Sequence, residues 1–223
     1  MKGKITEIFE SIQGEGPYLG KRQIFVRFYN CNLNCKFCDT RIERFKEYTP
    51  QEVLDKIESF SDGHHSISFT GGEPLLQKDF LGQVLKLTKE RGWKNYLETN
   101  GTLPQALSEV IGYVDIIAMD IKLPSSSGMQ GTWGMHQRFL GIAAQKEIFV
   151  KMVICSSTVE EDLRKGIDII KKVNSSLCLV LQPNSLEDFL QLRQRLCVFE
   201  GICRNEKINV SIMPQMHKLM RVK

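Results

Sequence analysis

The sequence has no long apolar run. None of its segments approaches the roughly 20 consecutive apolar residues of a membrane-spanning helix. The opening MKGKITEIFES also lacks the apolar stretch that is typical of a signal peptide. We therefore expect no membrane partner and a cytoplasmic location.

An excess of charge of one sign is also missing. The chain carries 30 Lys and Arg against 26 Asp and Glu, which gives a net charge of +4, and the two signs are interspersed along the sequence. Proteins that bind nucleic acid concentrate basic residues in patches or runs, so we expect no nucleic-acid partner. The charges indicate an ordinary solvated surface.

Repeats, low-complexity stretches and long linkers are absent as well. A chain of 223 residues with 42% hydrophobic content can bury a full core. We expect a single domain over residues 1–223, with residues 1–22 as an N-terminal extension. Residues 125–137, which contain serines and several glycines, are predicted to form a flexible loop over the functional site.

The sequence does contain an alternation of apolar, strand-like runs and helical patterns. Apolar runs bounded mostly by polar residues, Gly or Pro predict strands at 23–29, 66–70, 95–98, 115–119, 148–154, 177–182 and 208–213. Thr49 with Glu52 and Ser157 with Glu160 have the spacing of capping boxes, and Gly92 is a predicted C-cap. Nearly continuous apolar strands separated by helices predict an α/β fold with a parallel sheet, either a (β/α) barrel or a doubly wound sheet.

Polar motifs follow the predicted strands and favour the barrel. They stand at 31–38, 70–74, 98–101, 120–122, 182–185 and 214–217. Taken singly, each has an ordinary structural explanation, such as a tight turn at Asn100-Gly101 or an N-cap at Ser185 with Asp188 three residues later. Since barrel enzymes assemble their sites at the carboxyl ends of their strands, the joint placement predicts one functional site.

Three cysteines, Cys31, Cys35 and Cys38, stand in one short loop after the first predicted strand. The spacing CxxxCxxC, with Phe37 before the last cysteine, supplies three thiolates to an iron-sulfur cube. The fourth iron is then free to hold a substrate or cofactor. We interpret the loop as the site of a catalytic 4Fe-4S cluster.

The fourth ligand that other metal sites require is missing nearby. Structural zinc normally needs a fourth Cys or His at comparable spacing, and a ferredoxin-type cluster needs a fourth Cys. His64 and His65 lack zinc-finger spacing. The remaining cysteines lie in or beside apolar runs and are predicted to be small buried hydrophobic residues, not disulfide partners: Cys155, Cys178, Cys197 and Cys203.

The cysteine loop, together with Gly71-Gly72-Glu73-Pro74 one strand later, resembles the radical S-adenosylmethionine (SAM) superfamily. The resemblance implies a partial (β/α) barrel of about six parallel strands. It also implies that the open iron binds SAM and that an electron from the cluster cleaves it to a 5'-deoxyadenosyl radical. The backbone of Gly72 and Glu73 would meet the methionine amino group, and the backbone beside Phe37 would meet adenine.

A closer resemblance covers almost the whole chain. The segments EIFESIQGEG (7–16), FVRF (25–28), CDT (38–40), ETNG (98–101), DIK (120–122), LQP (181–183) and QMHK (215–218) are similar to the 7-carboxy-7-deazaguanine synthase family. This resemblance implies a lyase that converts 6-carboxy-5,6,7,8-tetrahydropterin to 7-carboxy-7-deazaguanine by hydrogen abstraction, radical ring contraction and loss of ammonia. It also implies a homodimer, an electron donor such as flavodoxin or ferredoxin, and a place in the biosynthesis of queuosine or archaeosine for tRNA modification.

The family resemblance assigns residues to the substrate. They are Ile12, Gln13, Gly14, Glu15, Arg27, Thr70 and His217. Residues 12–15 would face the edge of the pterin. Arg27, flanked by apolar neighbours in a strand, needs an anionic partner, and the substrate carboxylate fits its bidentate guanidinium. The alternatives are an ion pair of Arg27 with Glu98 or Asp120, and a plain polar role for His217.

The resemblance also assigns residues to SAM and to metals. The SAM-binding residues would be Phe37, Gly72, Glu73, Lys122, Ser125, Gln182 and Ser185. The three cysteines would hold the cluster. Thr40 would give one hydroxyl oxygen to a magnesium ion beside the substrate carboxylate, with water and substrate completing the octahedron. Asp39 is a competing oxygen donor, and Thr40 is otherwise an ordinary loop residue.

Two other functions remain open at this point. A glycyl-radical-enzyme activating enzyme shares the cysteine spacing, the Gly-Gly-Glu-Pro turn and the chain length. Such an enzyme must seat a protein loop and has no need of Arg27 or Thr40. A cysteine-rich binding or electron-carrier module would not need the polar residues that follow the predicted strands.

Overall fold

A single curved sheet organises the chain. In the computed structural model, which describes residues 1–39 and 44–220, nine strands lie in the order β3-β1-β2-β4-β5-β6-β7-β8-β9. The strands from β2 to β9 in this order are parallel, and β1 and β3 pair antiparallel at one edge. Their bounds are β1 Gly3–Ile12, β2 Arg22–Phe28, β3 Lys46–Tyr48, β4 Ser66–Gly71, β5 Asn95–Thr99, β6 Ile116–Asp120, β7 Glu147–Ile154, β8 Cys178–Pro183 and β9 Asn209–Ile212.

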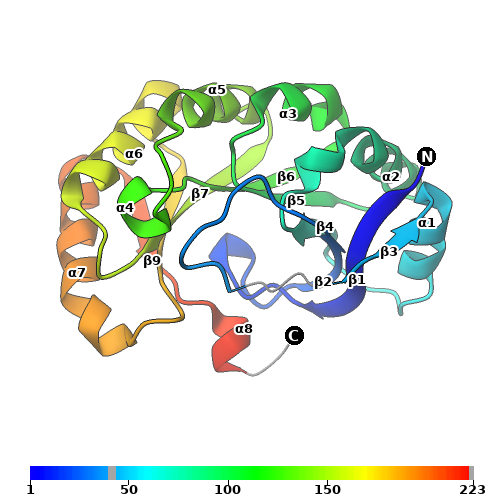
Figure 1. Cartoon of the computed structure of the whole chain (residues 1–223), viewed down its shortest axis with the longest axis horizontal. Coiled ribbons are helices and arrows are strands. Elements are labelled where there is room, and N and C mark those ends of the chain that lie inside the picture. The colour runs from blue at the N-terminus through cyan, green and yellow to red at the C-terminus, as the bar shows by residue number, and fades with distance from the viewer. Residues whose placement is uncertain (40–43, 221–223) are drawn as a thin grey trace.

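Helices cover the outside of this sheet. Figure 1 shows α1, α2, α3, α5, α6 and α7 around the curve, with α8 near the open side. The α-helices are α1 Pro50–Glu58, α2 Lys78–Glu90, α3 Pro104–Val110, α4 Pro124–Ser127, α5 Trp133–Ala143, α6 Glu160–Val173, α7 Phe189–Asn205 and α8 Met216–Leu219. Short 3-10 helices are η1 Gly16–Tyr18, η2 Pro74–Gln77 and η3 Ile111–Tyr113. The predicted α/β partial barrel is confirmed, with one more parallel strand than the resemblance implied.

Local sequence signals explain several helix ends. At the start of α1, Thr49 Oγ1 accepts from Glu52 N at 3.2 Å, and the Glu52 carboxylate accepts from Thr49 N at 2.6 Å, which confirms the capping box. Gly92 follows the end of α2 with a φ of +81°, a left-handed conformation that favours glycine. These two signals therefore bound the first two helices as predicted.

The predicted cap at Ser157 is wrong, and the alternative of an N-cap at Ser185 is not observed. α6 begins at Glu160 after Val159, and the Ser157 hydroxyl donates to the Ser125 carbonyl instead of capping the helix. α7 begins after Asp188, whose carboxylate accepts from Leu190 N at 2.9 Å, so Ser185 is not the N-cap. In both loops the serine that matched the pattern contacts another segment.

The predicted loop at 125–137 is also wrong as a continuous loop. Its first residues belong to α4 and its last residues to α5, with a turn between them in which Gly128 has a φ of +72°. Ser127 O accepts from Lys36 N at 2.9 Å, so this turn region packs against the cysteine loop.

The two faces of the sheet carry different side chains. The outer face packs against the helices and holds the large apolar core, which includes Val26, Phe69, Leu97, Ile117 and Met119. On the inner face, a smaller cluster lies near the start of the central strands: Tyr96, Ile116, Ala118, Phe149 and Val180. Side chains alternate along a strand, so a residue two positions after one of these lies on the same inner face. Four polar residues are placed in this way: Glu98, Asp120, Lys151 and Gln182.

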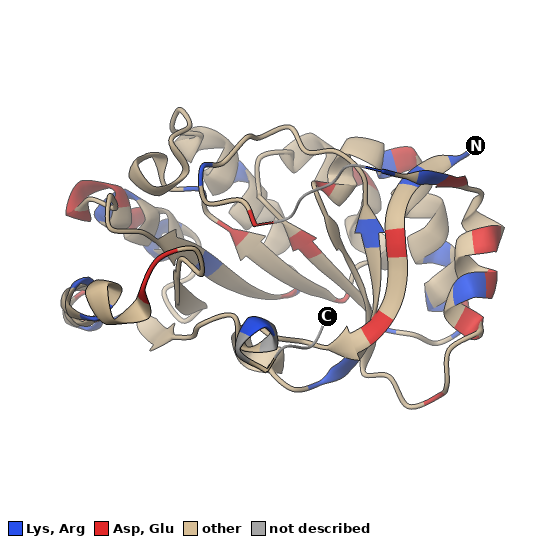
Figure 2. Cartoon of the chain, turned by 60° about the horizontal axis from the view of Figure 1, so that its bottom comes forward, with Lys and Arg blue, Asp and Glu red and all other residues tan. Residues whose placement is uncertain are grey.

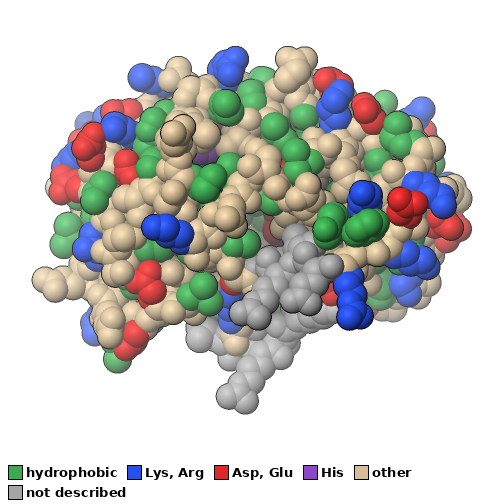
Figure 3. Space-filling view, in the orientation of Figure 1, with side chains coloured by type: hydrophobic (Ala, Val, Ile, Leu, Met, Phe, Trp, Pro, Cys, Tyr) green, Lys and Arg blue, Asp and Glu red, His purple; other side chains and the backbone are tan. Residues whose placement is uncertain are grey.

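The surface fits the mild net charge. Figure 3 shows Lys and Arg, Asp and Glu, and hydrophobic side chains interspersed over the face that it draws. Within the described ranges, the helices are all too short or too polar to cross a membrane.

Candidate functional site

A cavity of about 850 Å³ lies at the carboxyl ends of the parallel strands. Its lining includes residues of the cysteine loop, the Gly71-Gly72 turn, the N-terminal segment and the ends of β5 to β8. Figure 2 shows acidic residues on strand arrowheads that point toward this end of the molecule. The polar motifs that follow the predicted strands thus converge at one site.

The three cysteines of the loop all line this cavity. Cys31 and Cys35 are half-buried and Cys38 is exposed. Burial raises the pKa of the Cys31 thiol above its ordinary value and raises the pKa of the Cys35 thiol to about 11. Thiols with a raised pKa stay protonated at neutral pH, and a metal ion that coordinated them would remove the proton.

The cysteines are not arranged around one ion. In the part of the chain that the structure describes, no three His, Cys, Asp or Glu side chains are grouped so that they could hold a single metal ion. Thiolates that share an iron-sulfur cube bind different irons and need not meet at one point, so the loop is compatible with a cluster. Among the other cysteines, Cys155 and Cys203 are buried as predicted, whereas Cys178 is only partly buried and Cys197 is exposed.

The Gly-Gly-Glu-Pro turn packs directly against the start of the cysteine loop. A Cβ atom on Gly72 would lie 1.8 Å from Asn30 O, so only glycine fits there. The turn is also held by hydrogen bonds from Gly72 N to Phe28 O at 3.1 Å and from Glu73 N to Asn30 O at 2.8 Å. The backbone of this turn therefore lines the cavity beside Cys31.

The Glu73 side chain points away from the cavity lining. It is fully buried and accepts from Leu75 N at 3.1 Å, Thr99 Oγ1 at 3.0 Å and Asn100 N at 2.8 Å. Burial raises the pKa of Glu73 to about 7, although these donors oppose the shift. Its carboxyl group ties the turn after β4 to the end of β5.

Glu98 is a centre of hydrogen bonding in the cavity. Its carboxylate accepts from Gln13 Nε2 at 2.9 Å and from Thr70 Oγ1 at 2.7 Å. Gln13 also donates to Gln23 Oε1 at 3.1 Å and accepts from Glu15 N at 3.0 Å. The structure thus brings the N-terminal segment and Thr70 together around a carboxylate that the sequence placed in a strand-end motif but gave no role beyond an alternative ion pair with Arg27.

Glu15 is the centre of a second cluster of polar side chains. Its carboxylate pairs with Lys151 Nζ and accepts from Gln182 Nε2 at 3.3 Å and Gln215 Nε2 at 2.7 Å. Burial lowers the pKa of Lys151, but the nearby carboxylates of Glu15, Asp120 and Glu98 outweigh it and hold the pKa above its ordinary value. Sequence reasoning missed Lys151, which stands inside the predicted strand 148–154 and follows no motif.

Lys122 lies between an acid and an aromatic ring. Its ammonium is 2.8 Å from Asp120 Oδ2 and 5.0 Å from the centre of the Phe37 ring. Burial lowers the pKa of Lys122, and the Asp120 carboxylate more than offsets this effect, so the lysine is held as a cation. Asp120 Oδ1 and Gln182 Oε1 are buried without a hydrogen-bond partner among the described residues, and both residues line the cavity. These two oxygens are acceptors that a polar ligand can use.

Arg27 forms an ion pair with Glu7, a residue that the sequence did not suggest as its partner. Its Nε donates to Glu7 Oε1 at 2.8 Å, across the antiparallel pairing of β1 and β2, and its guanidinium lies 5.6 Å from the centre of the Phe9 ring. The alternative of a structural ion pair is thus observed in kind, but its partner is Glu7 and not Glu98 or Asp120. Arg27 is about one-fifth exposed and lines the cavity, so a ligand can reach it.

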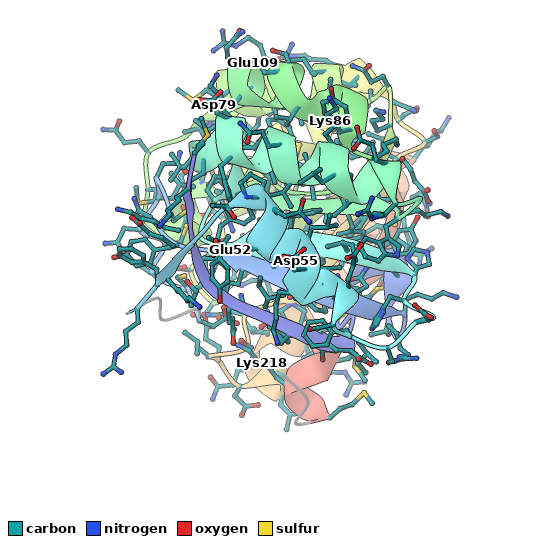
Figure 4. The ribbon with its side chains drawn as sticks, turned by 90° about the vertical axis from the view of Figure 1, so that its right-hand side faces the viewer. Glu52, Asp55, Asp79, Lys86, Glu109 and Lys218 are labelled. Atoms are coloured by element: carbon teal, nitrogen blue, oxygen red, sulfur yellow. The ribbon has the colours of Figure 1, made fainter. Side chains whose placement is uncertain are left out.

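The C-terminal segment closes one side of the cavity. Met216 N donates to Gly14 O at 3.0 Å. Lys218 pairs with Asp39 and donates to Ser185 Oγ at 2.6 Å. In Figure 4, Lys218 lies on α8, apart from the outer helix α1.

The remaining predicted residues have different outcomes. Ile12 and Gly14 line the cavity, and Ser125 does not. Ser125 Oγ accepts from Val159 N at 3.1 Å and Ser125 N donates to Asp162 at 2.8 Å. Ser125 therefore forms hydrogen bonds with the start of α6 and not with the cavity. Thr40 and the His217 side chain lie outside the described residues.

Comparisons with known proteins agree with this geometry. Residues 25–196 match the family described as the Radical SAM superfamily. The chain is 39% identical to the 7-carboxy-7-deazaguanine synthase of Geobacter sulfurreducens and 36% identical to that of Thermoplasma acidophilum, over 97% of this chain and 96% of each relative.

Solved structures share the fold. The crystal structure of QueE from Escherichia coli has a TM-score of 0.66 at 21% identity, over 96% of this chain and 94% of that one. SuiB from Streptococcus suis bound to S-adenosylmethionine has a TM-score of 0.58 at 16% identity, over 83% and 45%. With near-complete coverage by relatives above 30% identity, the chain belongs to the 7-carboxy-7-deazaguanine synthase family, within the radical SAM superfamily.

Proposed function

We propose that this chain converts 6-carboxy-5,6,7,8-tetrahydropterin to 7-carboxy-7-deazaguanine with loss of ammonia, as a radical SAM lyase. The observation that carries the proposal is one cavity that joins the three cysteines to a set of carboxylates, amides and a half-buried arginine. The name shared by relatives along the whole chain supports it and disfavours a glycyl-radical activating enzyme. Membership of the radical SAM superfamily implies a 4Fe-4S cluster and SAM as cofactors.

The cofactors would occupy the half of the cavity nearest the cysteine loop. Cys31, Cys35 and Cys38 would hold the cluster, whose open iron would bind SAM, and together they supply a radical that abstracts hydrogen. The Gly72 backbone leaves room for the methionine end because it carries no side chain. The other proposed SAM contacts are the backbone at Phe37 and Glu73 and the side chains of Lys122, Gln182 and Ser185.

The substrate would occupy the half nearest the N-terminal segment. A pterin presents N–H donors and acceptors along one edge, and residues 12–15 offer backbone groups, the Gln13 amide and the Glu15 carboxylate there. Thr70 and Glu98 would face the ring. Arg27 would bind the substrate carboxylate with its guanidinium while Glu7 holds Nε, which fixes the plane of the fork. His217 stays a proposed substrate contact.

An anaerobic assay tests the function. Reconstituted protein should hold about four irons per chain and form deazapurine product from the carboxytetrahydropterin, SAM and a reductant. Arg27→Ala should keep its iron and its uncoupled cleavage of SAM, because the lost contact is to the substrate alone. Losing a desolvated charged contact costs about 2–5 kcal/mol, so turnover should fall about 30-fold to several-thousand-fold.

Arg22 provides the matched control. It lies on the same strand and pairs with Glu10, but its side chain is 46% exposed and it does not line the cavity. Arg22→Ala should turn over like the parent. Near-normal turnover of Arg27→Ala, or activity only toward a glycyl-radical protein, would contradict the proposal, and one tightly bound zinc without sulfide would contradict the cluster.

We also propose that magnesium takes part through Thr40. A lone hydroxyl ligand binds magnesium weakly until the substrate carboxylate completes the octahedron, so magnesium should lower the apparent KM and matter little for SAM cleavage alone. Thr40→Ala should weaken that response and Thr40→Ser should keep it, in a titration of initial rate against magnesium. If all three curves superimpose, Thr40 is not a ligand. Asp39, which pairs with Lys218, is then the next candidate.

The cellular setting belongs to the same proposal. We infer a cytoplasmic homodimer that takes its electron from flavodoxin or ferredoxin. Its product would serve 7-deazapurine biosynthesis for queuosine or archaeosine, and so tRNA modification. Sedimentation of the reconstituted protein and turnover with each donor test the dimer and the reductase separately.

A further inference from the structure

The side-chain amide of Asn100 has a fixed orientation beside the cysteine loop. Its Oδ1 accepts from Thr102 N at 3.0 Å and from Thr102 Oγ1 at 2.6 Å. The two N–H groups of Nδ2 are thereby turned toward the loop, where they face Asn32 Oδ1 at 2.9 Å and Cys31 Sγ at 3.7 Å. An asparagine amide has two donors and one acceptor oxygen with two lone pairs, so every one of them has a partner.

The backbone of Asn100 is held just as firmly. Its N–H donates to the buried carboxyl group of Glu73 at 2.8 Å, and its carbonyl accepts from His136 Nε2 at 3.1 Å. The residue is only 6% exposed. If the Asn100 side-chain amide turned away, buried groups that now bond to it would lose their hydrogen bonds. The Nδ2 N–H is therefore preorganised toward Cys31 Sγ.

We propose that Asn100 tunes the 4Fe-4S cluster through Cys31, by donating an N–H···S hydrogen bond that raises the reduction potential of the cluster. The inference rests on the cluster assigned under the proposed function. Reduction adds one electron from the external donor and breaks no bond, and the extra negative charge is shared by the cysteine sulfurs. A positive N–H end at one of these sulfurs stabilises the reduced state more than the oxidised state.

Asn32 offers a matched comparison in the same network. Its amide N–H donates to Thr102 Oγ1 at 2.8 Å, and the atom that it turns toward Cys31 Sγ, at 4.0 Å, is its oxygen. An oxygen cannot donate to a cluster-bound thiolate. Removing the Asn32 amide therefore loosens the same loop without removing the hydrogen bond to sulfur.

The test is a redox titration of reconstituted protein with dithionite, followed by EPR, on the parent, Asn100→Ala and Asn32→Ala. Iron and sulfide are assayed in each. Asn100→Ala should have a more negative midpoint potential, with the ratio of reduced to oxidised cluster on the order of ten-fold lower at the potential where the parent is half reduced. Asn32→Ala removes an amide oxygen 4.0 Å from the sulfur, so its potential should equal that of the parent or be more positive. After exchange into D₂O, pulsed EPR should show weaker deuterium coupling in Asn100→Ala only.

Equal shifts in both variants, or no shift in either, would overturn the proposal. If Asn100→Ala does not hold its cluster, Thr102→Val and Thr102→Ser decide the question. Valine removes one of the two donors that orient the amide and should shift the potential the same way by a smaller amount, whereas serine should not. Identical potentials in these two variants overturn the proposal as well. A parent without iron and sulfide refutes the cluster itself, and with it the proposed function.

Discussion

Replacing Lys151 by methionine would leave the Glu15 carboxylate buried without its cationic partner. The two side chains are only 11% and 13% exposed. Removing one member of a buried ion pair costs about 3–5 kcal/mol, because the remaining charge has lost both water and its counter-ion. The amides of Gln182 and Gln215 still donate to Glu15, so we expect the lower end, about 3 kcal/mol.

Thermal unfolding followed by circular dichroism measures this cost. For chains of about 150–250 residues, 1 kcal/mol corresponds to about 2–4 °C, so the Tm of Lys151→Met should fall by about 6–12 °C. Arg164→Met is the control. Arg164 pairs with Glu160 in an i,i+4 pair with side chains 47% and 53% exposed, and with Glu206, which is 35% exposed, at 3.4 Å. Because water screens both pairs, the Tm should change by about 2 °C or less.

A second variant separates charge from packing. Glu15→Gln combined with Lys151→Met removes both charges and keeps an oxygen for the two glutamine donors, so most of the lost stability should return. The reasoning is refuted if Lys151→Met melts within about 2 °C of the parent. It is also refuted if the double variant is no more stable than the single one.

Two further predictions concern the surroundings of the cysteine loop. Gly72→Ala should reduce the iron content well below that of the parent, because its Cβ would lie 1.8 Å from Asn30 O. Gly112→Ala is the control and should bind iron normally, because a Cβ at that position would have no atom within 4 Å. Equal iron contents in the two variants would contradict the steric argument. Burial lowers the pKa of His136 from 6.5 to about 4, so its contribution to stability is complete above pH 6.5 and is lost as the pH falls toward 4. Urea unfolding of the apoprotein across this range should show a smaller loss for His136→Gln than for the parent, and parallel curves would exclude the histidine as the cause.

The parallel strands could be predicted because most of them are buried on both faces of the sheet. All seven predicted runs overlap observed strands, from β2 at Arg22–Phe28 to β9 at Asn209–Ile212. β1, Gly3–Ile12, was missed because its sequence GKITEIFESI mixes charged and apolar residues, as an antiparallel strand near the edge does. β3 has only three residues, which is too short for any periodicity.

Missing β1 had a direct consequence at the site. The residue opposite Arg27 is Glu7 on β1. Without that strand, the sequence offered only carboxylates at the ends of other strands as ion-pair partners for Arg27. Lys151 was missed for a related reason. A lysine within an apolar run gives no motif, and its role depends on Glu15, which is 136 positions away in the sequence. Pairings between distant segments need the fold, whereas the cysteine loop and the glycine turn are local and could be predicted.

The region that matches the radical SAM superfamily spans residues 25–196, and the segments on either side of it meet over the cavity through Met216 N on Gly14 O and Gln215 on Glu15. The wall of the cavity on this side is therefore built by segments outside the region that the superfamily shares. The two flanks depend on each other, because a substitution at Glu15 removes the acceptor to which Gln215 donates. A chimera that takes one flank from a distant relative would keep the cysteine loop but separate the two partners of each contact, whereas a chimera that takes both flanks would keep the partners together.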